Sequence, residues 1–269
     1  MMATEEAMNL VKEHQVFRFV QGAGISEVLD SVVTEYALTV YVNDEEMATV
    51  VCSPEHMEDL VTGFLASEGV IRSIDQIEEL YVNSLRGIAR VKTSNKVNFN
   101  QDFYNKRYIA SCCGKSRQTF YFYNDAHTAR KITDSFQIHP DDVFRAMEAM
   151  EDSSFVFHHT GGVHTASLAD NGEIILSRSD IGRHNALDKI YGYALRNQLD
   201  LTGKFITFSG RLSSEVLLKV SKIGVGMVLA KSAPTKLALD IADELNITTV
   251  GFVRGKTFNI YTHPERIKV

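Results

Sequence analysis

The chain has 269 residues, of which 44% are hydrophobic and 23% charged, and its formal net charge is −6. This composition is typical of a globular protein with one large domain or two modest ones, and the negative charge argues against general nucleic-acid binding. No apolar run approaches the ~20 residues that cross a bilayer, so we expect no membrane association. The N-terminus lacks a secretory pattern and the chain has three cysteines, which favours a cytoplasmic location.

The first part of the chain predicts a small α+β region that follows a loose arm. Residues 1–18 contain an unpatterned polar stretch, and we expect a flexible arm there. Residues 19–100 then form the smaller N-terminal region. Its expected elements are a strand over residues 36–42 with a turn at Asn43-Asp44, a helix opening with Ser53 as N-cap and Pro54 at its first position, and a hairpin of residues 78–83 and 88–93.

Two adjacent cysteines, Cys112 and Cys113, are the part of the sequence best suited to covalent chemistry. Nearby positive charge lowers the pKa of a thiol and favours the reactive thiolate. Four cations flank the pair: Lys106, Arg107, Lys115 and Arg117. The third cysteine, Cys52, follows an apolar run and is expected to be a buried small hydrophobe. The sequence therefore favours a redox or sulfur-carrying role for Cys112 and Cys113.

Three other interpretations of the cysteine pair remain open. Both thiols could be inert packing groups, although their surroundings are charged. A disulfide between neighbouring cysteines would need a strained peptide geometry. Zinc ligands usually come as cysteine pairs spaced by two to four residues, and adjacent cysteines fit that spacing poorly.

Residues 101–269 predict a main α/β domain. Its first elements are expected to be a strand at residues 119–123, a helix over residues 140–150, a strand at residues 155–158, and a hairpin of residues 163–168 and 173–177 with a tight Asn-Gly turn. The last third alternates strands at residues 205–208, 226–230 and 248–253 with helices over residues 213–223 and 232–246. This alternation predicts a parallel sheet, to which residues 258–262 add an antiparallel edge strand.

Polar residues follow each of these parallel strands. Ligands of open α/β sheets bind outside the carboxyl ends of the strands, and helix N-termini favour anions. The three runs at these ends are Ser209-Gly210-Arg211, Ser232-Ala233-Pro234-Thr235 and Arg254-Gly255-Lys256-Thr257. A serine or threonine at a helix start is usually only a cap, but three such runs at one edge favour a nucleotide or another phosphorylated ligand.

Two further polar segments are candidate parts of the site. The run from Asp180 to Lys189 contains Arg183, His184 and Asn185 in succession at a predicted helix start. Asp180 could be a plain N-cap and His184 a hydrogen-bonded core histidine, but three consecutive polar residues favour a functional role. Three histidines, His158, His159 and His164, could bind metal, donate to phosphate or shuttle protons.

The same stretches carry a family resemblance. They are Ser111-Cys112-Cys113-Gly114-Lys115, Thr160-Gly161-Gly162-Val163-His164, residues 180–189, residues 209–216, residues 232–235, Gly251-Phe252-Val253-Arg254 and residues 261–267. Together they resemble the FdhD family, the sulfurtransferases required for formate dehydrogenase activity. Some members of that family have two cysteines separated by two residues, whereas here they are adjacent, so both Cys112 and Cys113 stay candidates for the sulfur-carrying thiol.

The resemblance implies a function, a fold and a set of partners. Such proteins take sulfur from a cysteine desulfurase as a cysteine persulfide and pass it to the molybdenum (or tungsten) bis(molybdopterin guanine dinucleotide) cofactor for formate dehydrogenase. Their fold is a three-layer α/β/α sandwich resembling that of the cytidine deaminases, and they form homodimers. The resemblance places cofactor binding at Phe252, Val253, Arg254, Gly255, Lys256 and Thr257.

Two alternative functions remain. One is a cofactor chaperone that delivers the cofactor without moving sulfur. The other is a zinc-dependent deaminase, which needs His-x-Glu followed by Pro-Cys-x-x-Cys. His56-Met57-Glu58 and His263-Pro264-Glu265 match the first half, but the second half does not occur in the sequence. We therefore expect no zinc.

Overall fold

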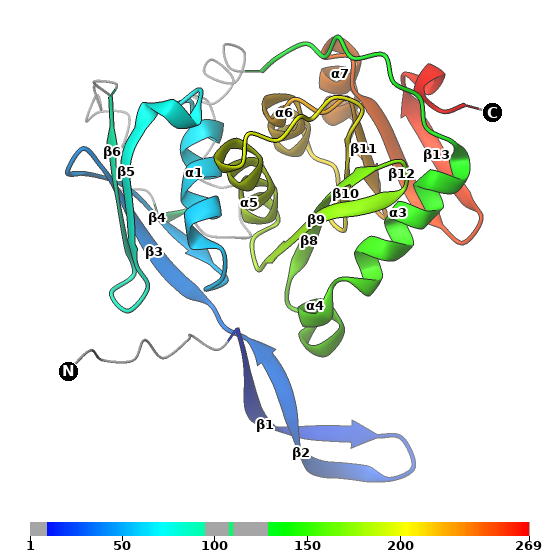
Figure 1. Cartoon of the computed structure of the whole chain (residues 1–269). Coiled ribbons are helices and arrows are strands. Elements are labelled where there is room, and N and C mark those ends of the chain that lie inside the picture. The colour runs from blue at the N-terminus through cyan, green and yellow to red at the C-terminus, as the bar shows by residue number, and fades with distance from the viewer. Residues whose placement is uncertain (1–9, 95–107, 110–128, 269) are drawn as a thin grey trace.

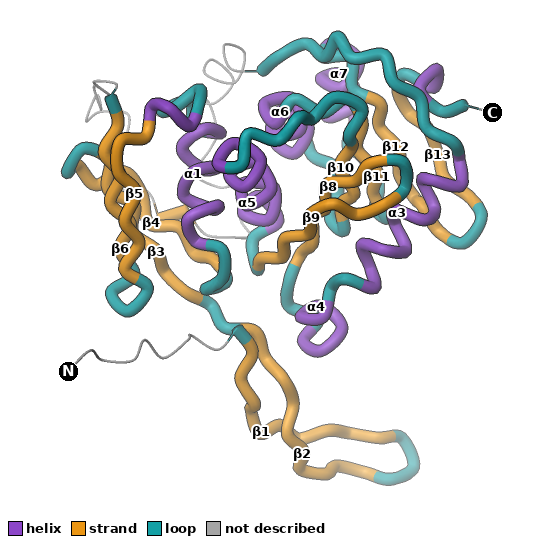
Figure 2. Tube along the Cα trace, in the orientation of Figure 1, coloured by secondary structure: helices purple, strands orange, loops and turns teal. Residues whose placement is uncertain are grey.

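The computed structural model describes residues 10–94, 108–109 and 129–268. These residues form two mixed sheets, a set of helices around and between them, and a separate two-stranded hairpin (Figure 1). Figure 2 shows helices between the two sheets and on the far side of the larger one. Within the described residues, no helix is long and apolar enough to cross a membrane.

The smaller sheet is built from the N-terminal part of the chain. Its strand order is β5-β6-β3-β4-β7, and the expected turn at Asn43-Asp44 is confirmed, with both residues at positive φ. Helix α1 (Met57–Ser67) covers this sheet on the side facing the rest of the molecule (Figure 1). The strands are β3 (Tyr36–Val42), β4 (Glu45–Cys52), β5 (Ile77–Asn83), β6 (Ile88–Thr93) and β7 (Tyr108–Ile109), with the short 3-10 helix η1 (Ile74–Gln76) before β5.

The larger sheet has the order β13-β12-β11-β10-β8-β9. Its central strands β10, β11 and β12 are parallel, whereas β8, β9 and β13 run antiparallel to their neighbours, so the predicted parallel sheet and its antiparallel edge are confirmed. The strands are β8 (His164–Asp170), β9 (Glu173–Asp180), β10 (Phe205–Phe208), β11 (Met227–Ala230), β12 (Thr248–Arg254) and β13 (Thr257–Thr262), and the 3-10 helix η3 (Pro264–Arg266) follows.

Helices cover both faces of the larger sheet because its strands alternate buried side chains between two cores. Phe205, Met227 and Leu229 pack with α3 (Pro140–Asp152) on one face. Ile206 and Val228 point to the opposite face and join the main core with α5, α6 and α7. This helix–sheet–helix layering is an α/β arrangement; likeness to the cytidine deaminases and the domain boundaries stay predictions. The covering helices are α5 (Arg183–Arg196), α6 (Ser214–Ile223) and α7 (Lys236–Glu244).

The chain before the smaller sheet forms an antiparallel hairpin, so residues 11–18 are part of a strand rather than of the expected flexible arm, and residues 1–9 of that arm lie outside the described residues. Strands β1 (Val11–Val20) and β2 (Gly24–Val33) pair over their full length. The sequence of β1 alternates only over Phe17-Arg18-Phe19, which is too short a stretch to predict a strand. Figure 1 shows the hairpin extending away from the body of the molecule.

Two other predicted elements are also wrong. Helix α1 begins at Met57 rather than at Ser53, because the backbone N–H of Ser53 donates to Asp180 Oδ2 (3.0 Å) and its Oγ accepts from the N–H of Ile181 (3.1 Å). Residues 155–158 belong to helix α4 (Phe155–Thr160) rather than to a strand. Short apolar runs do not distinguish a helix from a strand by periodicity. The strand predicted at residues 119–123 lies outside the described residues.

Candidate functional site

Three loops meet at the carboxyl ends of β10, β11 and β12, as the sequence predicted. Leu212 donates its N–H to the carbonyl of Ala233 (3.2 Å) and accepts from the N–H of Thr235 (3.0 Å). Phe252 then donates to the carbonyl of Ser232 (3.4 Å). These backbone bonds hold the loops after the three strands side by side, so their side chains share one edge of the sheet.

Several hydroxyls of these loops have local partners. Thr235 Oγ1 accepts from the N–H of Ala238 (3.3 Å), which makes it the N-cap of α7. Ser209 accepts on its Oγ from the N–H of Thr165 (2.9 Å) and donates its own N–H to the carbonyl of that residue (3.0 Å). Ser209 and Thr235 therefore shape the loops. In contrast, Ser213 Oγ at the start of α6 is buried with no hydrogen-bond partner among the described residues.

Gly210 allows a close approach between the β10 loop and the start of β8. A Cβ at this position would lie 2.8 Å from the ring of Phe208 and 3.5 Å from Nδ1 of His164. Any side chain at this position would have to displace the Phe208 ring, so only glycine fits without a steric clash. Arg211, the next residue, is exposed to solvent.

A cluster of polar side chains lies beside this loop. His184 Nε2 is 3.0 Å from Glu215 Oε2, which joins the first turns of α5 and α6. Burial, together with the nearby Arg183 guanidinium, holds the pKa of His164 below its ordinary value, so this imidazole is neutral at physiological pH. Arg183 Nε is buried and has no hydrogen-bond partner in the described part of the chain. The cluster thus combines a neutral histidine with polar atoms available to a ligand.

The end of β12 has an irregular backbone. Phe252 has φ 53°, in the left-handed region, and the pairing of β12 with β13 shifts register between Gly251 and Arg254. The guanidinium of Arg254 lies over the Phe252 ring, 5.8 Å from its centroid. Val253 is buried, whereas Gly255, Lys256 and Thr257 are exposed. The bulge therefore presents Arg254 and Lys256 at the surface next to the loop of Ser232.

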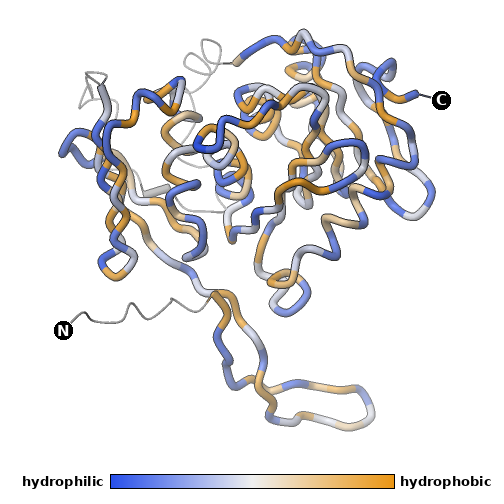
Figure 3. Tube along the Cα trace, in the orientation of Figure 1, coloured by the Kyte–Doolittle hydropathy of each residue, from blue (hydrophilic) through white to orange (hydrophobic). Residues whose placement is uncertain are grey.

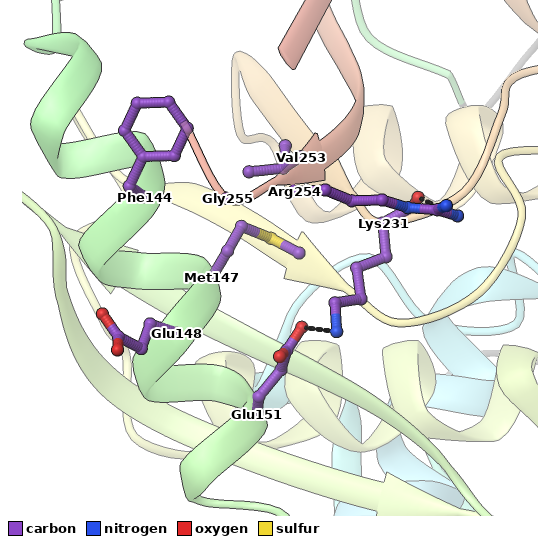
Figure 4. A pocket seen from close by; sticks show the side chains of 8 residues that line it. All are labelled: Phe144, Met147, Glu148, Glu151, Lys231, Val253, Arg254 and Gly255. Carbon is purple, nitrogen blue, oxygen red and sulfur yellow. Dashed lines mark hydrogen bonds and ion pairs between the residues drawn. The ribbon is translucent and has the colours of Figure 1, made fainter. Parts of the chain in front are cut away.

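A pocket of about 470 Å³ opens between α3 and the ends of β11 and β12 (Figure 4). Its volume is within the range of small-molecule sites. Phe144, Met147 and Val253 supply apolar lining, and Lys231 forms an ion pair with Glu151 across it. The remaining lining residues are Glu148, Arg254 and Gly255. The pocket thus combines an apolar wall with two carboxylates and two cations, of which Glu151 and Lys231 are paired with each other.

Sequence reasoning missed Lys231, Glu151, Glu148 and Glu215. Lys231 could have been found, because it directly follows β11 at the same edge as the predicted loops. Glu148 and Glu151 lie three residues apart on α3, but nothing in the sequence says that α3 borders the strand ends. Glu215 lies in the matched run of residues 209–216, yet its pairing with His184 depends on how α5 packs beside α6.

The run of residues 180–189 is mainly a buried network. Asp180 forms an ion pair with Lys189 (2.7 Å), and neither side chain has any exposed surface. Asp180 Oδ1 also accepts from the Gly182 N–H and from Asn185 Nδ2, both at 2.8 Å. Asn185 Nδ2 donates in addition to the carbonyl of Val51 (2.8 Å). Most of this polar run therefore fixes the start of α5 against β4. Arg183 and His184 are outside this network and are half-buried.

The two predicted sulfur-carrying residues, Cys112 and Cys113, lie outside the described residues. The described strand β7 nevertheless shows where the chain leading to them is anchored, because Ile109 pairs with Val50 in parallel register. Cys52, at the end of β4, is buried as expected. Burial raises the pKa of its thiol to about 12, and the nearby Asp180 carboxylate acts in the same direction, so Cys52 is not a nucleophile.

Comparison with known proteins adds to this geometry. The sequence profile of the FdhD/NarQ family matches residues 33–268. The chain belongs to the FdhD/NarQ family. Relatives named "Sulfur carrier protein FdhD" include those of Listeria innocua, 51% identical over 97% of this chain and 100% of the relative, and Halalkalibacterium halodurans, 50% identical over 99% of this chain and 96% of the relative. The Bacillus subtilis relative is 51% identical over 94% of this chain and 96% of its own length.

A solved structure supports the fold of this FdhD/NarQ member. A crystal structure of a candidate formate dehydrogenase accessory protein from Desulfotalea psychrophila superimposes with a TM-score of 0.79 at 23% identity, and covers 97% of this chain and 100% of that one. Among the described residues no group of three or more His, Cys, Asp or Glu side chains is placed to hold a metal ion. His56 and His263, the histidines of the two His-x-Glu runs, both have left-handed backbones at helix starts.

Proposed function

We propose that the protein is a sulfurtransferase that carries sulfur from a cysteine desulfurase to the molybdenum bis(molybdopterin guanine dinucleotide) cofactor required by formate dehydrogenase. It would act in the cytoplasm, where thiols stay reduced. Membership of the FdhD/NarQ family and the names of the relatives support this function. The cofactor is the substrate of the transfer and arrives and leaves with its metal.

The anchoring of β7 is the observation that carries the proposal. Ile109 pairs with Val50, and the next residue of β4, Val51, is hydrogen-bonded to Asn185 at the start of α5. Cys112 follows Ile109 by three residues, and three residues of extended chain reach about 11 Å at most. Ile109, three residues before Cys112, is thus held on the strand that pairs with β4, and β4 is hydrogen-bonded to the start of α5.

The loops at the strand ends suit the phosphate groups of the cofactor. Lys231, Arg254 and Lys256 lie at this edge, and guanidinium and ammonium groups bind phosphate through charge-assisted hydrogen bonds. The start of α6 adds backbone N–H groups and Ser213 Oγ, which has no hydrogen-bond partner within the part of the chain that the structure describes. The predicted binding residues Phe252 to Thr257 and Ser209 to Arg211 belong to this same edge. We propose that the guanylyl phosphates lie here.

Sulfur moves in two displacements at the cysteine pair. In the first, one thiolate attacks the terminal sulfur of the donor persulfide; the donor S–S bond breaks with its electron pair on the donor cysteine, and a new S–S bond forms on the carrier. In the second, the other thiolate attacks the inner sulfur, and the terminal sulfur leaves with the bonding electrons as sulfide for the metal. The disulfide left between neighbours is strained, and a dithiol reductant returns it to two thiols.

Intact-mass spectrometry tests the first displacement. The protein is incubated with a cysteine desulfurase and cysteine, and we expect a gain of about one sulfur atom that a reductant removes. Cys112→Ala and Cys113→Ala identify the acceptor, and Cys52→Ala is the matched control, because its buried high-pKa thiol should carry no sulfur. No gain with an active donor would rule out sulfur carriage and favour the cofactor chaperone.

A further inference from the structure

Another pocket lies at the opposite end of α6 from the loops at the strand ends. Its volume is about 180 Å³, which is smaller than the roughly 300–1,000 Å³ of sites for drug-sized ligands. Lys222 lines it from the last turn of α6, whereas Ser213, at the start of that helix, belongs to the edge proposed for the cofactor phosphates. A helix of ten residues is about 15 Å long, so the pocket is separate from the site described above.

Four segments of the chain meet around this pocket. They are the turn after α1 with Arg72, α5 with Tyr191, α6 with Lys222, and the segment of Arg130, where the described chain resumes at residue 129. Figure 3 shows hydrophilic residues just after this point. The backbone of Arg130 is fixed on α6, because its N–H donates to Ser221 Oγ (2.8 Å) and that hydroxyl donates to its carbonyl (2.8 Å).

The pocket gathers positive charge in a chain whose net charge is −6. Its cations are Arg72, Arg130 and Lys222, and no carboxylate is among the described residues that line it. Neither guanidinium forms an ion pair within the described part of the chain. The nearby Asp188 is already paired with Lys219. The two guanidinium groups are therefore available to an anion.

Tyr191 adds a hydrogen-bond donor to this pocket. Its side chain is only 7% exposed, and its hydroxyl has no hydrogen-bond partner among the residues that the structure describes. A tyrosine hydroxyl usually has a partner when it is buried. Burial raises the pKa of Tyr191, and the Arg130 guanidinium acts in the opposite direction, which places the hydroxyl near that cation. The hydroxyl thus stays protonated and can donate to a bound anion.

Lys222 offsets a charge that would otherwise oppose an anion here. The C-terminal end of a helix carries partial negative charge, and the pocket lies at the end of α1. Lys222 Nζ donates to the carbonyl of Ser67, the last residue of α1 (2.6 Å). The side chain is 6% exposed, so its ammonium group is held at that helix end. The pocket therefore keeps a net positive charge.

We propose that this pocket is a phosphate-group site in which Arg72 and Arg130 bind the phosphate oxygens and the Tyr191 hydroxyl donates a further hydrogen bond. Guanidinium groups match phosphate oxygens with paired N–H donors. The small volume suits inorganic phosphate, or the phosphate of a larger ligand whose remainder stays outside the pocket. A bound phosphate ties the turn after α1 to α5 and α6, so it holds together helices that cover different sheets.

Isothermal titration calorimetry of the full chain with inorganic phosphate tests this site. We expect the wild type to bind phosphate with a dissociation constant below about 1 mM. Arg130→Ala should raise this constant about 10-fold or more, as expected for the loss of a hydrogen bond between charged groups. Tyr191→Phe keeps the ring and removes only the hydroxyl, and should raise the constant about threefold or more.

Lys131→Ala is the matched control. It removes the same charge from the residue after Arg130, but Lys131 is exposed and does not line the pocket. The dissociation constant should therefore stay within about twofold of the wild-type value, because screened surface charges interact weakly. Thermal unfolding at constant ionic strength gives a second readout: phosphate should raise the Tm of the wild type and of Lys131→Ala, but not that of Arg130→Ala.

Glycerol 3-phosphate distinguishes the two sources of the phosphate group. Binding that is tighter than that of inorganic phosphate and depends on Arg130 would identify the phosphate of a larger ligand, whereas weaker binding would identify the free ion. A wild type that binds no phosphate at about 10 mM would overturn the proposal, as would equal affinities of the wild type, Arg130→Ala and Tyr191→Phe. Loss of binding in Arg254→Ala rather than in Arg130→Ala would also overturn it, because the phosphate would then lie at the strand ends. Sulfur loading is measured separately and does not enter these results.

Discussion

Gly63 and Gly192 face each other where α1 crosses α5. A Cβ on Gly63 would lie 1.8 Å from the carbonyl oxygen of Asp188, and a Cβ on Gly192 would lie 1.8 Å from that of Asp59. The two helix backbones therefore touch. This crossing joins the smaller sheet to the larger one, since α1 covers the first and α5 packs on β8 and β9 of the second.

Replacing Gly192 by alanine should destabilise the protein. Helix propensity alone would make this change favourable by about 1 kcal/mol, but the added methyl group must push the helices apart. We expect the free energy of unfolding to fall by about 2–3 kcal/mol, measured by urea denaturation. Ala194→Gly, in the same helix, is the control for propensity; if propensity dominated, the two variants would shift stability in opposite directions.

The Asp180–Lys189 pair should be sensitive to loss of one partner. Lys189→Met leaves a fully buried carboxylate without its cation, and breaking a buried pair costs about 3–5 kcal/mol. Adding Asp180→Asn removes that charge and should recover part of the loss, because the amide oxygen still accepts from Gly182 and Asn185. Chemical denaturation checks both variants; a double variant no more stable than Lys189→Met would contradict this assignment.

Arg254 should contribute to binding of the guanylyl group. Loss of a hydrogen bond to a charged partner costs about 1.5–3 kcal/mol, so Arg254→Ala should weaken GDP binding by about 10- to 100-fold in calorimetry. The affinity of the variant should also depend less on salt. Arg90→Ala is the control, since Arg90 is exposed on the smaller sheet and pairs with Asp44. Equal affinities of the wild type and Arg254→Ala would place the phosphates elsewhere.

Stability should decrease on mild acidification because of His164. Burial lowers the pKa of this histidine in the folded protein, so below its unfolded pKa of about 6.5 the unfolded state binds more protons than the folded state. The contribution of His164 to the free energy of unfolding is therefore constant above about pH 6.5 and decreases as the pH falls below that value. His164→Gln should flatten the profile between neutral and mildly acidic pH, with a residual slope from His56, whose pKa burial also lowers. An unchanged profile would show that His164 is protonated freely in the folded state.

Local patterns were sufficient for most elements of the larger sheet. Strand β10 and helix α6 follow the predicted ranges to within a residue. Three of the four β10 residues are apolar and the fourth is the β-branched Thr207, and α6 has a serine at its start and Gly224 at its end, which are strong signals. The three loops at the strand ends could be placed together because parallel strands end at one edge. The prediction of Ser53 as an N-cap was wrong because its hydrogen-bond partners are not local. They are Asp180 and Ile181, which are more than a hundred residues away in the sequence.

The family, the order of strands and helices in the last third of the chain, and the grouping of residues 209–211, 232–235 and 254–257 at one edge could all be predicted from the sequence. These follow from periodicity and motif, which are local. The folded structure was needed to show that Asp180, Asn185 and Lys189 form a buried network, and that Lys231 and Glu151 border a pocket with Arg254. It was also needed to show that Phe17 and Phe19 stay exposed among the described residues. Burial and long-range pairing depend on which surfaces meet, and that information is not contained in any single segment.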